Sequence, residues 1–265
     1  MTRLQWTTIF SAVLLFAGLY FGFKTTPKDR KAIETKRMIE GTPTDFATLE
    51  NAAKSAIAPA QLAQLDALAA KASSEKDEKA KLALLKELAG GYFQAGSPLL
   101  SGKTADQIAE IEKTDAAWSI AGATWQIAGT NSKDQSAHDF CGKHAIAAFE
   151  NAVSIKPDEV AHQVNLASVY ADFPLPENPM KAVLMLRDLE AKHPDNPLVY
   201  NALGRLAIKT NQWDRAIARF EKAIELDPKN KQANCLLVDA YRGAKQDAKA
   251  TEQEKRCNLL QGTGK

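Results

Sequence analysis

Three short segments contain residue types that can do chemistry. Residues 213–228 (WDRAIARFEKAIELDP) combine acids, bases and aromatics. Residues 138–144 (HDFCGKH) place His138, Cys141 and His144 three residues apart, a spacing that could hold a metal ion. Residues 96–104 (GSPLLSGKT) contain the Gly-Lys-Thr sequence that also occurs in phosphate-binding loops. Each segment also has a structural interpretation.

Residues 96–104 do not fit a phosphate-binding loop, because the spacing of the glycines and the preceding element both differ. A Walker A loop has four residues between its glycines and follows a β-strand. Here five residues separate Gly96 from Gly102, and a helical pattern precedes them. We expect an inter-helix turn, with Thr104 as the N-cap of the next helix and Gln107 completing a capping box.

Residues 138–144 offer too few ligands for a structural metal site. A structural zinc site needs a fourth ligand and usually more thiolates, and the acids nearby in the sequence are Asp134 and Asp139. We expect instead a long inter-helix loop, AGTNSKDQSAHDFCG, with Cys141 packed as a small hydrophobe. No cofactor is predicted. A metal-using accessory of an enzyme complex, with His138, Cys141 and His144 as ligands, stays as an alternative function.

Composition indicates an all-α globular protein. Of the 265 residues, 45% are hydrophobic and 25% are charged, with a net charge of +2. Frequent Ala, Leu, Lys and Glu favour helices, and no segment alternates as a strand would. The near-neutral charge gives no reason to expect nucleic acid as a partner. Paired catalytic carboxylates, nucleophile elbows and metalloprotease motifs are absent from the sequence, so we expect neither an enzyme nor a small-molecule substrate.

Residues 6–23 (WTTIFSAVLLFAGLYFGF) carry no charge and, as a helix, would extend about 27 Å, enough to cross a bilayer core. Because no small-residue cleavage site follows, residues 1–23 are predicted to be an uncleaved single-pass anchor in the inner (plasma) membrane. A basic linker, residues 24–43, comes next. By the positive-inside rule it favours the cytoplasmic side for the rest of the chain, with the periplasmic side as the alternative.

The three cysteines, Cys141, Cys235 and Cys257, are an odd number in a large helical protein. They do not resemble a disulfide framework and favour a reducing compartment, although a Cys235–Cys257 bridge stays open.

A 34-residue pattern explains the first of the three segments. Residues 197–230 read Tyr200-x2-Leu203-Gly204-x2-Ala207, followed by Ala216, Phe220, Ala223 and Pro228. This pattern resembles the tetratricopeptide repeat (TPR), which consists of two packed helices. Asn196-Pro197 would begin the first helix, and Asp227-Pro228 would end the second. The charges of residues 213–228 are then a solvated outer face.

A second strong copy occupies residues 160–196, and weaker copies occupy residues 82–113, 115–157 and 231–259. The second helix of residues 82–113 is short, and residues 231–259 lose the pattern where Glu254 replaces the aromatic. Residues 44–81 would link or cap the repeats, and residues 260–265 form a tail. The resemblance implies a TPR-like α-solenoid, a right-handed superhelix of helix pairs, after a single transmembrane helix. Its packing residues would be Trp118, Trp125, Phe149, Tyr170, Tyr200, Leu203, Gly204, Ala216, Phe220 and Ala223. Because two of the tryptophans are used in this way, a base-stacking platform is not expected.

In TPR proteins the first helix of each repeat lines a groove that binds a peptide or helix. The resemblance places these residues there: Gln126, Asn165, Ser168, Asn201, Arg205, Lys209 and Arg242. Asn201, Arg205 and Lys209 share one helix face and could bind an acidic peptide. Val164 and Ser168 stand where the chaperone-binding carboxylate clamp needs Lys and Asn, so that clamp is not expected. The sequence thus predicts a non-enzymatic, membrane-anchored scaffold of bacterial type, with an outward-facing factor of cytochrome maturation or envelope assembly as an alternative.

Overall fold

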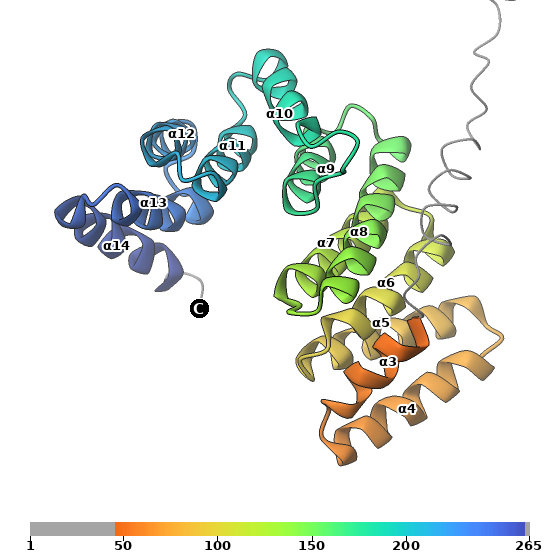
Figure 1. Cartoon of the computed structure of the whole chain (residues 1–265). Helices are drawn as coiled ribbons and strands as arrows, with labels where there is room; N and C mark the ends of the chain where they lie inside the picture. Colours follow the sequence, from red (N-terminus) through yellow and green to blue (C-terminus); the bar gives the residue numbers. More distant parts are fainter. Residues whose placement is uncertain (1–45, 263–265) are drawn as a thin grey trace, which may run out of the picture. The chain divides into compact units, whose positions relative to one another are not determined.

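The computed structural model describes residues 46–262, which form twelve α-helices (Figure 1). The chain divides into two units, Met1–Thr42 and Pro43–Lys265, and these helices belong to the second. They are α3 (Phe46–Ser55), α4 (Pro59–Ser74), α5 (Glu78–Gln94), α6 (Pro98–Glu112), α7 (Asp115–Asn131), α8 (Gln135–Ile155), α9 (Val160–Asp172), α10 (Lys181–Lys192), α11 (Pro197–Lys209), α12 (Trp213–Leu226), α13 (Lys231–Gly243) and α14 (Asp247–Gly262).

The predicted anchor at residues 6–23 and the linker at residues 24–43 lie outside the described residues. Within residues 46–262, no helix is both long enough and apolar enough to cross a membrane.

The helices form a helical repeat. From α4 onward each helix packs against the next one along the chain, and α7, α9, α11 and α13 also contact one another in series. The first helices of successive pairs therefore form one layer, and the second helices cover it (Figure 1). This arrangement is the all-α TPR-like fold that the sequence pattern predicts.

Local signals set most helix ends. Asn196 caps α11 by accepting a 3.0 Å hydrogen bond from the N–H of Leu198, and Pro197 occupies the first helical position. At the other end of the pair, α12 stops at Leu226 because Asp227 is extended before Pro228.

A glycine–aromatic contact packs the two helices of a pair together. A Cβ atom at Gly204 would lie 2.5 Å from the Phe220 ring, and one at Gly122 would lie 2.8 Å from the Phe149 ring. Both phenylalanines are almost fully buried. The predicted packing residues are buried, except that Trp118 is half-buried. Close helix approach therefore depends on a missing side chain on one helix and a large ring on the other.

The structure corrects the turn expected at residues 96–104. Helix α6 already begins at Pro98, after the N-cap residue Ser97. Thr104 lies inside this helix and donates a 2.9 Å hydrogen bond from Oγ1 to the carbonyl oxygen of Leu100. The proline at the first helical position decides where the helix starts, so the second helix of residues 82–113 is not short.

The prediction of a long loop between α7 and α8 is also wrong. α7 runs to Asn131 and α8 begins at Gln135. Asp134 caps α8 by accepting a hydrogen bond from the N–H of Ser136 at 2.7 Å. Gly129 of α7 lets Phe173 pack closely against this helix, because a Cβ atom there would lie 2.7 Å from the Phe173 ring.

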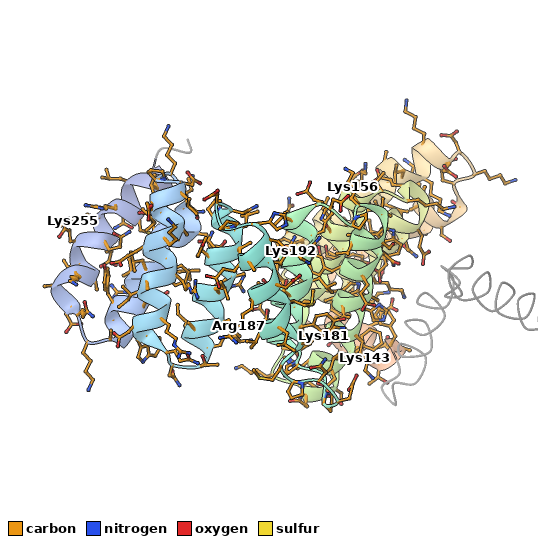
Figure 2. The ribbon with its side chains drawn as sticks, turned by 90° about the horizontal axis from the view of Figure 1, so that it is seen from above. Lys143, Lys156, Lys181, Arg187, Lys192 and Lys255 are labelled. Carbon is orange, nitrogen blue, oxygen red and sulfur yellow. A yellow bond between two sulfur atoms is a disulfide. The ribbon has the colours of Figure 1, made fainter. Side chains whose placement is uncertain are left out.

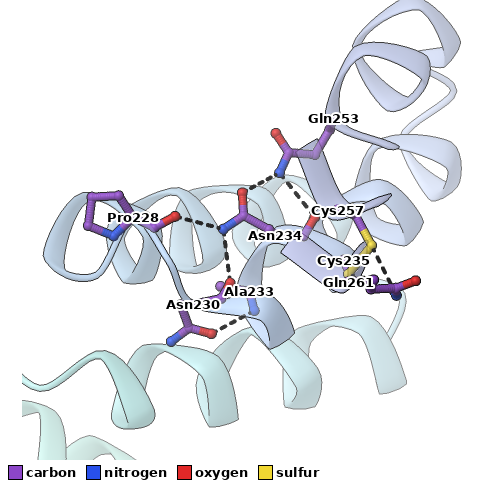
Figure 3. The surroundings of a disulfide bond; sticks show 8 residues. All are labelled: Pro228, Asn230, Ala233, Asn234, Cys235, Gln253, Cys257 and Gln261. Atoms are coloured by element: carbon purple, nitrogen blue, oxygen red, sulfur yellow. Dashed lines mark hydrogen bonds between the residues drawn. A yellow bond between two sulfur atoms is a disulfide. The ribbon is translucent and has the colours of Figure 1, made fainter. Parts of the chain in front are cut away.

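The bridge that the sequence left open is present, although the number of cysteines favoured a reducing compartment. Cys235 of α13 and Cys257 of α14 form a disulfide (Figure 3). Cys141 is free and buried. Gln253 donates two hydrogen bonds from Nε2 to Asn234, at 3.0 Å to its carbonyl oxygen and 2.9 Å to Oδ1. These covalent and polar links hold the last helix pair together at the point where Glu254 replaces the repeat aromatic.

Candidate functional site

The candidate site lies on the exposed side of the first-helix layer. We call this surface the groove face and define it by the following residues: Phe93, Ile120, Ile127, Ser168, Asp172, Arg205 and Lys209. They come from α5, α7, α9 and α11, which are consecutive first helices of the repeats.

A pocket on the groove face brings together three of the predicted groove residues. Ser168, Arg205 and Lys209 line a cavity of about 180 Å³ between α9, α11 and α13. Its apolar lining comes from Ala171, Leu186, Ala202, Leu206, Ile208 and Leu236. This groove pocket has an apolar floor with a hydroxyl and charged groups at its edge, a combination that suits one apolar side chain of a peptide next to a polar group.

Asp172 organises the charges at this pocket, and the sequence analysis missed it. Lys209 donates from Nζ to Asp172 Oδ1 at 2.5 Å and to the carbonyl oxygen of Ala171 at 3.0 Å. Gln126 donates from Nε2 to Asp172 Oδ2 at 2.7 Å. The Asp172 side chain is only 8% exposed, so this buried carboxylate ties α7, α9 and α11 together. Lys209 and Gln126 are thus engaged within the protein.

Arg205 is the cation at the groove pocket that can still bind a partner. It is exposed and makes no ion pair within the described part of the chain. A guanidinium in this position can bind a carboxylate through two parallel hydrogen bonds.

Asn201, which was predicted for the groove, is buried. It is 3% exposed and donates from Nδ2 to Asn230 Oδ1 at 3.1 Å. The turn before α13 covers it, an effect of neighbouring-repeat packing that spacing along α11 does not reveal. Arg242, predicted for the same face, is paired with Glu254 of α14 at 2.9 Å, and Asn165 is half-buried on α9.

Exposed apolar residues extend the groove face toward the N-terminal repeats. Phe93 on α5 is 49% exposed, and Ile120 and Ile127 on α7 are 63% and 40% exposed. The two isoleucines are seven residues apart and so lie on the same side of α7. That spacing was a readable signal that the sequence analysis did not use. Large apolar side chains on one face of a solvated layer are characteristic of interaction surfaces.

Of the three residues considered for a metal site, the two histidines have other partners and Cys141 is buried. His138 Nδ1 lies 3.0 Å from the carbonyl oxygen of Gly129, and His144 Nδ1 lies 3.2 Å from Asp106 Oδ2. Burial raises the pKa of the Cys141 thiol to about 12, which disfavours the thiolate that a metal needs. Residues 46–262 contain no group of three His, Cys, Asp or Glu side chains placed to hold a metal ion.

A Ser–His–Asp arrangement joins α7 to α9. Ser119 Oγ lies 2.8 Å from His162 Nδ1, and His162 Nε2 lies 2.8 Å from Asp115 Oδ2. Lys156 adds a 3.0 Å ion pair to the same carboxylate oxygen, and the hydrogen bonds from His162 and Lys156 lower the pKa of Asp115 to about 2. Ser119 lies within α7, where backbone N–H groups are bonded along the helix and cannot stabilise an oxyanion. We therefore interpret the arrangement as a link between two repeats.

Comparison with known families identifies the repeat. The model of the tetratricopeptide repeat family matches residues 197–230. This chain contains a tetratricopeptide repeat. The TPR match coincides with the α11–α12 pair, whose Gly204–Phe220 contact and Asp227-Pro228 end are described above. A comparison with curated proteins found no match.

Two solved structures align with much of the chain at low sequence identity. MamA from Desulfovibrio magneticus RS-1 is 17% identical and aligns over 71% of this chain and 97% of its own, with a TM-score of 0.42. TTC0263, a thermophilic TPR protein of Thermus thermophilus, is 17% identical and aligns over 62% of this chain and 90% of its own, with a TM-score of 0.48. At these values the similarities carry no information on partner or activity.

Proposed function

We propose that this protein is a non-enzymatic scaffold that binds a segment of a partner protein on its groove face. The observation that carries the proposal is the groove pocket, where an apolar floor lies beside the exposed guanidinium of Arg205. The coarser conclusion, a TPR protein that mediates protein–protein interaction, follows from the repeat itself.

The groove face suggests the chemistry of the bound segment. An apolar side chain would enter the groove pocket, while an adjacent carboxylate would pair with Arg205. Further apolar residues of the partner would cover Phe93, Ile120 and Ile127, which are unfavourably exposed in the free protein. The scaffold supplies a rigid surface and contributes no chemistry of its own.

Site-specific crosslinking tests this proposal. A photoreactive amino acid in place of Ser168, used in native membranes, should crosslink to one protein segment that mass spectrometry can identify. A synthetic peptide of that segment should bind wild-type protein and bind Arg205→Glu and Ile120→Asp variants much more weakly. The matched controls are Lys229→Glu and Leu259→Asp, which change exposed residues outside the groove face. Equal peptide binding by all four variants would exclude the groove face.

We further propose that residues 6–23 anchor the chain in the inner (plasma) membrane and that the repeats lie on its outer, oxidising side. The support for this side is the Cys235–Cys257 disulfide, because disulfides persist in oxidising compartments and are rare in the cytoplasm. The basic residues after the span favour the opposite side, but their influence on topology is a bias and not a chemical requirement. On this side the protein would act as an outward-facing assembly factor.

Topology reporters fused to the C-terminus test the orientation. A reporter that is active only outside the cytoplasm should be active, and one that is active only in the cytoplasm should be silent. The reverse result would place the repeats in the cytoplasm, as the charge distribution suggests.

A further inference from the structure

A second pocket lies on a different face of α11 and is rich in arginine. Its volume is about 610 Å³, and we call it the arginine pocket. Val183 of α10 and Leu203, Leu206 and Ala207 of α11 supply its apolar floor. Arg187 of α10 and Arg215 and Arg219 of α12 form its charged edge, and the other lining residues are Met180, Thr210 and Gln212.

The arginine pocket is separate from the groove pocket. Around α11, the groove pocket uses Ala202, Arg205, Ile208 and Lys209, whereas the arginine pocket uses Leu203, Ala207 and Thr210. Because successive residues of a helix are rotated by about 100°, these sets point in different directions and meet only at Leu206. A ligand in the arginine pocket therefore faces the second helices, α10 and α12.

The charges at the arginine pocket are largely uncompensated. No acidic side chain lines it. Arg187 is exposed and has no ion pair among residues 46–262, and Figure 2 shows its side chain extending away from the ribbon. Arg215 donates from Nη1 to the neutral side chain of Gln212 at 2.5 Å. Arg219 pairs with Glu190. Among the described residues, Arg187 and Arg215 thus have no carboxylate partner.

The apolar surface continues outside the pocket along α10. Met180, which precedes α10 at the pocket edge, is 54% exposed, and Leu184 on α10 is 58% exposed. Val183 and Arg187 are four residues apart and so lie on the same side of α10. An elongated apolar strip with arginines on both sides fits an amphipathic helix better than a compact anion.

We propose that the arginine pocket binds an acidic amphipathic helix of a partner protein. The apolar side of that helix would lie on Val183, Leu203 and Leu206, and its Glu or Asp side chains would pair with Arg187 and Arg215. The scaffold then has two binding surfaces on different sides of one repeat, so that it can hold two segments at the same time.

Fluorescence anisotropy with the full-length protein in detergent tests this proposal. The probe is a labelled, end-blocked helical peptide of about 18 residues with leucines on one face and glutamates flanking them. We expect saturable binding, at least about ten-fold weaker binding by Arg187→Glu/Arg215→Glu, and little binding of the peptide with lysines in place of the glutamates. The control Lys229→Glu/Arg256→Glu changes the charge equally at exposed positions outside both pockets.

Two further measurements keep the result decisive. Arg187→Gln/Arg215→Gln should lose less affinity for the probe than the double glutamate variant. Thermal unfolding should show that all variants are folded. Arg205→Glu, which alters the groove pocket, should leave unchanged the part of probe binding that depends on Arg187 and Arg215. Equal binding by wild-type and arginine variants, or loss of binding in Arg205→Glu alone, would overturn the proposal. A third result would also overturn the proposal. If the peptide does not bind, but short-chain phosphatidylglycerol binds and its binding is lost in the arginine variants, the pocket is a lipid site.

Discussion

Cys235 of α13 and Cys257 of α14 are joined by a disulfide, with their Cα atoms 4.9 Å apart. The bond closes a loop with a sequence separation of 22 and fixes the final helix onto the repeat array. It lies beside the hydrogen bonds between Gln253 and Asn234, so covalent and polar links coincide at this end of the array (Figure 3).

Removal of the disulfide should destabilise the C-terminal helix pair. For a loop of this length, Cys235→Ser/Cys257→Ser should lower the free energy of unfolding by about 3 kcal/mol, because the unfolded chain regains loop entropy. Urea unfolding followed by hydrogen exchange of α14 measures this loss. A reductant should produce the same change in the wild type and none in the double variant. A reductant effect that persists in the double variant would contradict this assignment.

The Gly204–Phe220 contact should be intolerant of any added side chain. Gly204→Ala would bring Cβ to 2.5 Å from the Phe220 ring, and we expect a loss of about 1–3 kcal/mol from overpacking. Gly90 of α5 is the matched control, because a Cβ atom there would have no neighbour within 4 Å. Gly90→Ala should stabilise the protein by up to about 1 kcal/mol through helix propensity. Denaturant unfolding of both variants shows whether the signs are opposite.

Asp115 should contribute to stability against acid. The hydrogen bonds from His162 and Lys156 lower its pKa from 3.8 to about 2 in the folded state. Its stabilising contribution is therefore complete above about pH 4 and is lost as the pH falls through about 2. Asp115→Asn should make the free energy of unfolding fall less steeply between these values. Asp188→Asn, at an exposed carboxylate of α10, should leave the profile close to that of the wild type.

Loss of the Asp172 carboxylate should loosen three consecutive repeats. Asp172→Ala leaves Gln126 and Lys209 without their shared acceptor, and we expect a loss of about 1–3 kcal/mol. Asp172→Asn keeps a hydrogen-bond acceptor and should lose less. Hydrogen exchange should show the faster opening in α7, α9 and α11. A change confined to α9 would contradict the linking role.

Position within the repeat placed some of the candidate residues together. Ser168, Arg205 and Lys209 were predicted for the groove, and they line one pocket. Asn201 was predicted for the same face but is buried, because the turn of the next repeat covers it. Asp172 was missed because its partners are 46 and 37 residues away, on helices whose approach no single-sequence signal specifies.

The sequence by itself determined the helical class, the repeat and the ends of the α11–α12 pair. Those features depend on interactions within a few residues, such as the cap at Asn196 or the stop before Pro228. Only the tertiary structure decided which cysteines pair, which cations stay free, and that a second pocket opens between α10 and α12. These outcomes depend on how one repeat is placed against the next, which sums many weak contacts between residues distant in the sequence.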